Sequence, residues 1–165
     1  MAEAWLTKRL ARLMAVQALY SWDAEGGGAP WPRERLTPEV VAFFREQAAG
    51  EGEGEDSVTA VELAELAAAK EDRKLFRSIV AGATVECAAL DALLLPFFTR
   101  MPNQNQIAML PRAILRAGAF EVKSLGTPPA VVIAEYARVA ELFCAQDEVG
   151  FIHAVLDKVA KTGKE

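Results

Sequence analysis

Three basic side chains lie close together near the start of the chain. Lys8 and Arg12 are four residues apart, and Arg9 and Arg12 are three apart, so on a helix all three share one side. Like charges at this spacing destabilise an isolated helix, and a bound anion would offset their repulsion. The cluster therefore predicts an anion-binding face, for which RNA phosphates are a candidate. From the spacing alone, a solvated charged face fits equally well.

Two aromatic side chains, Phe143 and Phe151, flank a predicted turn between helices, with Asp147 between them. Exposed aromatic rings can stack on unpaired bases, which is a common way of holding single-stranded RNA. Taken alone, the residues favour packing of both rings into the core, which is the more frequent use of phenylalanine.

Other reactive residue types are too sparse to predict catalysis. The single histidine, His153, has no nucleophile to serve, and the two cysteines, Cys87 and Cys144, are too few for a disulfide framework or a four-thiolate metal site. Gly26-Gly27-Gly28 lacks the lysine of a phosphate-binding loop and is predicted to be a turn. We therefore expect no enzymatic activity, no catalytic residue, no metal and no cofactor.

The charge of the chain is unevenly distributed. The 165 residues carry a net charge of −5, which excludes a generally basic nucleic-acid binder. Residues 23–72 hold 4 basic and 13 acidic side chains, whereas residues 1–22 and 73–165 are each +2. The charge distribution is therefore still compatible with a small, local basic patch that binds nucleic acid.

The absence of a secretory signal and of a long apolar run predicts a cytoplasmic protein.

The pattern of apolar residues predicts an all-α fold. Alanine, the best helix former, occurs 31 times, and no long strand-like segment is visible. Thr7 is a candidate N-cap for the first helix, and Pro96 is expected to interrupt the chain. The expected helices are Lys8–Asp23, Pro38–Ala49, Ser57–Ala69, Glu71–Leu95, Leu110–Lys123, Thr127–Cys144 and Asp147–Lys161, with a flexible Gly/Glu-rich loop at 50–56.

Four stretches, taken together, resemble the NusB family of bacterial transcription antitermination factors. They cover about half of the chain in the order of the family: Arg12–Trp22, Leu75–Gly82 (the weakest match), Arg112–Glu121, and Pro129–Glu135 through Phe151–Lys158. The resemblance implies a single domain over residues 1–165, with about seven helices in two packed small bundles.

The resemblance also implies a function and its partners. NusB-like proteins pair with ribosomal protein NusE, bind the single-stranded boxA element of ribosomal RNA leaders, and join an RNA polymerase complex that reads through terminators. The positions that match the RNA-contacting residues of the family are Lys8, Arg9, Arg12, Arg116, Phe143, Asp147 and Phe151. This comparison shifts the interpretation of the two phenylalanines towards base contacts.

Tyr20 matches a position in the NusE interface, and Arg112 follows the position where the family has an acid against NusE. Here that position is Pro111, and the final helix reads Phe151-Ile-His-Ala in place of the usual Phe-Val-Asn-Gly. These departures leave a second reading open, a helical protein-interaction module or homodimer with weak or lost RNA binding. A substrate-binding domain like that of certain RNA cytosine methyltransferases is disfavoured, since no catalytic motif is present.

Overall fold

The computed structural model describes residues 4–27, 72–98 and 109–162, and these form six α-helices and one π-helical turn without a strand. The prediction of an all-α fold is confirmed. In chain order the elements are α1 (Ala4–Ala24), α4 (Arg73–Val85), α5 (Cys87–Phe98), α6 (Met109–Phe120), the π turn η3 (Glu121–Leu125), α7 (Pro129–Phe143) and α8 (Gln146–Lys161).

Helix α1 begins earlier than its pattern predicted. The helix already includes Ala4, so Thr7 lies inside it and the prediction of an N-cap at Thr7 was wrong. The expected stop is confirmed, because Gly26 and Gly27 have φ values of 109° and 63°. This left-handed backbone favours glycine and ends the helix.

The single helix expected over Glu71–Leu95 is instead two helices, α4 and α5, whose axes differ by 79°. No glycine or proline marks the break. Within the last turn of α4 the Thr84 hydroxyl donates to the carbonyls of Val80 and Ala81, at 2.8 and 3.1 Å, a contact that bends helices. The break at Pro96 was also predicted wrongly, since Pro96 lies inside α5. The fixed φ of proline is compatible with a helix, but proline removes one backbone hydrogen bond and its ring crowds the carbonyl four residues earlier.

The C-terminal half follows the prediction more closely. Helices α7 and α8 begin and end within two residues of the expected positions. At the start of α8 the Glu148 carboxylate accepts a hydrogen bond from the Ala145 amide at 3.0 Å. The helix expected to end at Lys123 changes to a π turn at Glu121 and ends at Gly126, whose φ is 70°.

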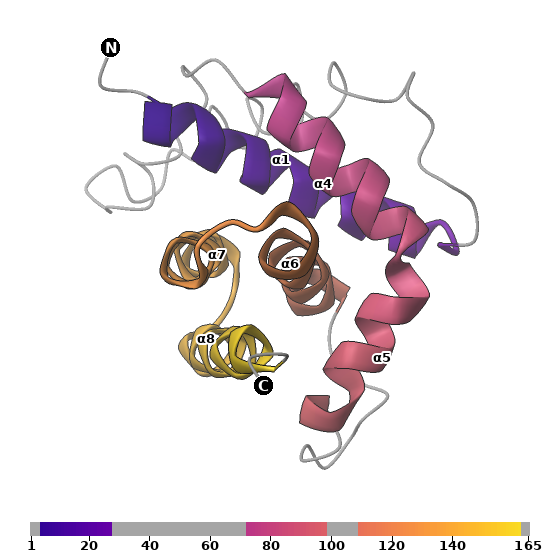
Figure 1. Cartoon of the computed structure of the whole chain (residues 1–165), viewed down its shortest axis with the longest axis vertical. Coiled ribbons are helices and arrows are strands. Elements are labelled where there is room, and N and C mark those ends of the chain that lie inside the picture. The colour runs from indigo at the N-terminus through magenta and orange to yellow at the C-terminus, as the bar shows by residue number, and fades with distance from the viewer. Residues whose placement is uncertain (1–3, 28–71, 99–108, 163–165) are drawn as a thin grey trace.

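Helix α6 is the centre of the molecule, since it contacts each of the other five described helices. In Figure 1, α6, α7 and α8 are seen nearly end-on, while α1 and α4 lie side by side across them. The core lies between these two groups and is filled from every described helix; its largest fully buried side chains include Leu13, Phe76, Leu94, Ile114, Tyr136 and Leu156.

Three predicted segments lie outside the described residues: the helices Pro38–Ala49 and Ser57–Ala69 and the loop at 50–56. None of the described helices is by itself long and apolar enough to cross a membrane, although the bent α4–α5 pair passes that test by length and composition.

Candidate nucleic-acid interface

The buried pair of Arg12 and Glu121 joins α1 to the π turn. Nε and Nη2 of Arg12 donate to the two carboxylate oxygens of Glu121 at 2.8 and 2.9 Å, with the side chains 5% and 0% exposed. Glu121 also accepts from the Tyr136 hydroxyl at 2.6 Å and from the Thr127 hydroxyl at 2.9 Å. Three side chains, from α1, the loop after η3 and α7, therefore meet at the carboxylate that η3 provides.

The pKa values of this cluster follow from burial and pairing. Burial alone would raise the pKa of Glu121, but the hydrogen bonds from Arg12 and Tyr136 outweigh it and lower that pKa. For Arg12, burial acts to lower the pKa and Glu121 reverses the effect, so the net pKa is raised. Burial, and then the charge of Glu121, hold the pKa of Tyr136 well above its usual value. The pair is thus charged, with a neutral phenol beside it, at neutral pH.

Carboxylates of the protein itself offset the repulsion for two of the three cations in the basic cluster. Arg12 pairs with Glu121, and Nε of Arg9 donates to Glu135 of α7 at 2.8 Å. Arg9 is partly buried, whereas Lys8 is exposed. The expected clustering on one side of α1 is therefore present, but only Lys8 and part of Arg9 face solvent.

Arg116 is the buried member of a second, partly exposed ion-pair cluster. Its Nε and Nη2 donate to Asp91 of α5 at 2.8 and 2.9 Å, and its Nη1 lies 3.3 Å from Asp23 at the end of α1. Arg116 is 6% exposed. Arg112 of α6 lies 3.8 Å from the same Asp23 carboxylate. These contacts tie α1, α5 and α6 together, and they direct Arg116 away from solvent.

The three predicted RNA contacts at the turn between α7 and α8 differ in their exposure to solvent. Phe143 ends α7 and is 38% exposed, and Asp147 in the first turn of α8 is also exposed. Phe151, one turn further along α8, is half-buried and packs against the core. Phe143 and Asp147 therefore have the accessibility that a base contact needs, while Phe151 offers only part of its ring.

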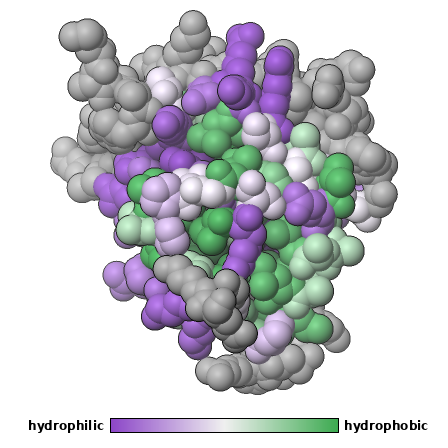
Figure 2. Space-filling view, in the orientation of Figure 1, coloured by the Kyte–Doolittle hydropathy of each residue, from purple (hydrophilic) through white to green (hydrophobic). Residues whose placement is uncertain are grey.

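The predicted partner residues gather at the C-terminal end of α1. Tyr20 is 37% exposed, Arg112 is half-exposed, and Pro111 is buried. Helix α5 adjoins them through the Arg116 cluster and carries exposed apolar side chains, with Leu95 at 54%. Figure 2 shows hydrophobic side chains gathered over α5 at the lower right of this face. Lys8 and Tyr20 are twelve residues, or about 18 Å, apart along α1.

The sequence interpretation missed the carboxylates that hold the arginines. Glu121 stands at the end of an apolar helix, and a lone acid in such a place is a usable signal, because buried acids are almost always paired. Glu135 and Asp91 give no such signal. Among the described residues, no group of three or more His, Cys, Asp or Glu side chains is placed to hold a metal ion.

Fold and site together define an all-α protein built around a central helix, with a basic start of α1 that is bound to α7 through Arg9 and Glu135. The chain belongs to the NusB family, whose model matches residues 9–161. It is 36% identical to a transcription antitermination protein NusB of Rhodopseudomonas palustris, over 94% of this chain and 79% of that protein. A protein of the same name from Nitrobacter hamburgensis is 35% identical over 92% of this chain and 84% of its own length.

Proposed function

We propose that the protein is an RNA-binding transcription antitermination factor of the cytoplasm. In this proposal residues 1–165 act as one NusB-like domain that binds boxA-type single-stranded RNA together with ribosomal protein NusE in an RNA polymerase complex. The observation that carries the proposal is the basic start of α1, where Lys8 is exposed and Arg9 is partly exposed, in a family whose relatives are named for antitermination.

We propose different roles for these RNA residues, according to how far each is exposed. Lys8 and Arg9 supply phosphate contacts, and Phe143, Asp147 and Phe151 supply contacts to bases. Arg12 and Arg116 are positioning residues, because their guanidinium groups are buried against Glu121 and Asp91. Tyr20, Arg112 and the exposed apolar side of α5 form the proposed NusE surface, which Pro111 supports from beneath.

Replacing Lys8 or Arg9 by alanine is expected to weaken binding to every single-stranded RNA and to reduce the slope of log affinity against log salt by about 0.7 per lost phosphate contact. Fluorescence anisotropy of a labelled boxA-like RNA, with and without NusE, measures both quantities. Lys161→Ala is the matched control, since Lys161 is exposed and paired with Asp157 on α8. No preference for boxA over a scrambled RNA at low salt, with NusE present, would refute the proposed function.

Replacing Phe143 or Phe151 by alanine is expected to weaken RNA binding about tenfold without changing the salt slope, because base stacking on an aromatic ring contributes about 1–3 kcal/mol. Val85→Ala is the control, since it truncates an apolar side chain that is 74% exposed on α4. A change in salt slope for either phenylalanine variant would contradict the assigned role.

A second candidate function, a homodimer or interaction module with weak RNA binding, is favoured by one observation. Two of the four predicted basic contacts, Arg12 and Arg116, are buried in ion pairs, which leaves fewer cations for phosphates. Light scattering with and without RNA separates the two functions, because a dimer that buries the start of α1 would show no mass shift on adding RNA.

A further inference from the structure

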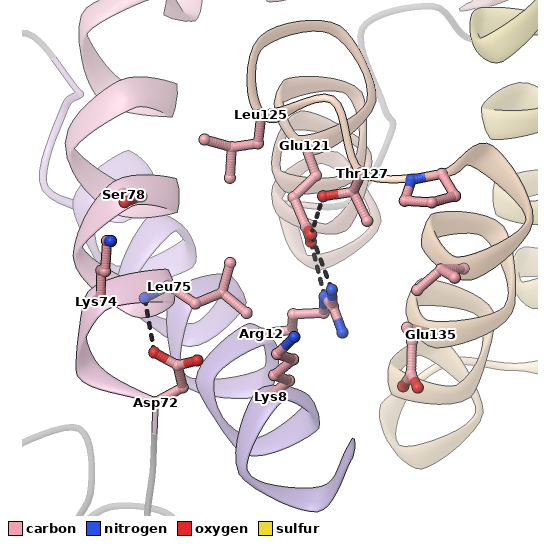
Figure 3. Close-up of a pocket in the computed structure, with 12 residues that line it drawn as sticks. Lys8, Arg12, Asp72, Lys74, Leu75, Ser78, Glu121, Leu125, Thr127 and Glu135 are labelled. Carbon is pink, nitrogen blue, oxygen red and sulfur yellow. Dashed lines mark hydrogen bonds and ion pairs between the residues drawn. The ribbon is translucent and has the colours of Figure 1, made fainter. Parts of the chain in front are cut away.

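A groove with a volume of about 660 Å³ opens between α1, α4, the π turn and the start of α7. Figure 3 shows Arg12 of α1, Leu75 of α4 and Glu121 of the π turn pointing toward one another, with Lys8 on α1 and Lys74 along α4 at the edges of the groove. No residue of α4 was among the predicted site residues. The Arg12–Glu121 pair forms the buried floor of the groove. A ligand would therefore contact mainly the side chains on the walls and at the rim.

The charged side chains that line the groove balance, with three cations and three carboxylates, and Arg9 beside the groove brings the total to +1. Each of its three carboxylates already has a partner: Glu121 has Arg12, Glu135 has Arg9, and Asp72 accepts from the Leu75 amide at the start of α4. Lys8 and Lys74 differ from these arginines, because both lysines are exposed and neither has a carboxylate partner among the described residues. Lys8 and Lys74 line the groove from different helices, and each ammonium group can bind a phosphate oxygen.

The rest of the wall suits a flat, partly apolar group. Leu125 and Val131 are large apolar side chains that are 40% and 42% exposed at the groove. Ser78 and Thr127 add hydroxyl groups that can donate or accept hydrogen bonds. A few polar groups set in an apolar wall are typical of small-ligand sites, whose volumes are about 300–1,000 Å³. A nucleotide is a ligand of this kind, because it joins a flat, partly apolar base to a phosphate.

The groove and the proposed RNA face share Lys8 and helix α7. Along α7, Val131 lines the groove, Glu135 holds Arg9 of the basic cluster, and Phe143 belongs to the aromatic turn. Lys8 lines the groove and is also part of the basic cluster. Val131 and Phe143 are twelve residues apart, about 18 Å along α7 and about 120° around it, so an RNA strand that contacts both would wind partly around α7 beside Lys8.

We propose that this groove binds one nucleotide of the RNA strand, with its phosphate between Lys8 and Lys74 and its base against Leu125 and Val131. The inference rests on the proposed RNA binding and extends it to a surface on α4 and α7. It adds Lys74, Leu125 and Val131 to the residues that contact RNA.

The first test compares Lys74→Ala with Arg77→Ala in the full chain, using the labelled boxA-like RNA and NusE. Both residues are exposed cations of α4, but only Lys74 lines the groove. Lys74→Ala is expected to weaken binding about three- to tenfold at low salt and to reduce the salt slope by about 0.7. Arg77→Ala is expected to change neither quantity.

The second test places a carboxylate in the groove without touching the core. Val131→Glu is expected to weaken RNA binding about tenfold by repelling the phosphate, whereas Ala134→Glu, an equal charge at an exposed α7 position outside the groove, is expected to have little effect. Circular dichroism verifies that both variants are folded. RNA carrying 4-thiouridine is expected to cross-link near Leu125 and Val131 as well as near the aromatic turn.

The outcomes separate the two proposals. If the wild-type chain binds RNA but each groove variant matches its control, the groove inference is overturned and the proposed function stands. If the wild-type chain binds no RNA, both are overturned. If uridine monophosphate alone shifts the NMR signals of Leu75 and Val131 while Lys74→Ala leaves RNA affinity unchanged, the groove takes a free nucleotide and the inference is overturned.

Discussion

Replacing Glu121 by glutamine is expected to lower the free energy of unfolding by about 3–5 kcal/mol, because it leaves the buried guanidinium of Arg12 without a counter-charge. The carboxylate also accepts hydrogen bonds from Tyr136 and Thr127. The substitution therefore weakens the contacts of the π turn with α1, with α7 and with the loop between the π turn and α7. For a chain of this size such a change lowers the melting temperature by roughly 10 °C. Thermal unfolding followed by circular dichroism measures it.

Glu141→Gln is the matched control for this prediction. Glu141 makes the same kind of contact with Arg138 on the surface of α7, where the two side chains are 49% and 38% exposed, and its loss is expected to cost at most about 0.5 kcal/mol. Equal melting temperatures for the two variants would show that the Glu121 cluster does not stabilise the fold.

The pH dependence gives an independent measure of the same cluster. The pKa of Glu121 is lowered in the folded protein, compared with about 4.3 in an unfolded chain. Its contribution to stability is therefore fully present above pH 4.3 and is lost as the pH falls through the lower, folded value. The difference in unfolding free energy between wild type and Glu121→Gln should narrow below about pH 4. A difference that stays constant into that range would contradict the lowered pKa.

Those parts of the fold whose signals are local could be predicted from the sequence. The starts of α7 and α8 follow from Pro129 and from the acidic pair Asp147 and Glu148, and the end of α1 follows from its glycines. The break between α4 and α5 could not be predicted, because it arises where α4 packs on α1 and α5 on α6, with only Thr84 bonding back to the backbone. Packing over long sequence distances leaves no periodic signal.

The site residues also divide into features that local spacing predicts and features that depend on distant residues. The spacing of Lys8, Arg9 and Arg12 placed them on one side of α1, but it could not tell which of them would be buried. That depends on Glu121, which is 109 residues from Arg12, and on Glu135, which is 126 residues from Arg9. A cluster of charges read from sequence therefore gives the position of a basic face, and the carboxylates of other elements decide how much of it is available to RNA.

Replacing Gly82 by alanine is expected to destabilise the fold by about 3 kcal/mol, near the upper end of the usual cost of overpacking. Gly82 lies in α4, where the ring of Phe120 from α6 rests directly on its backbone. An added Cβ would lie 2.0 Å from Cζ and 2.3 Å from Cε1 of that ring. Phe120 is 5% exposed, so its ring has little room to withdraw, and α4 would have to move away from α6.

Gly150→Ala provides a control of opposite sign. Gly150 also lies inside a helix, but nothing lies within 4 Å of the position of its Cβ, so alanine is expected to stabilise α8 by up to about 1 kcal/mol through helix propensity. Adding Phe120→Leu to Gly82→Ala should recover part of the lost stability, because the shorter side chain makes room for the methyl group. If urea unfolding shows Gly82→Ala to be as stable as Gly150→Ala, then α4 and α6 are not held together by this contact.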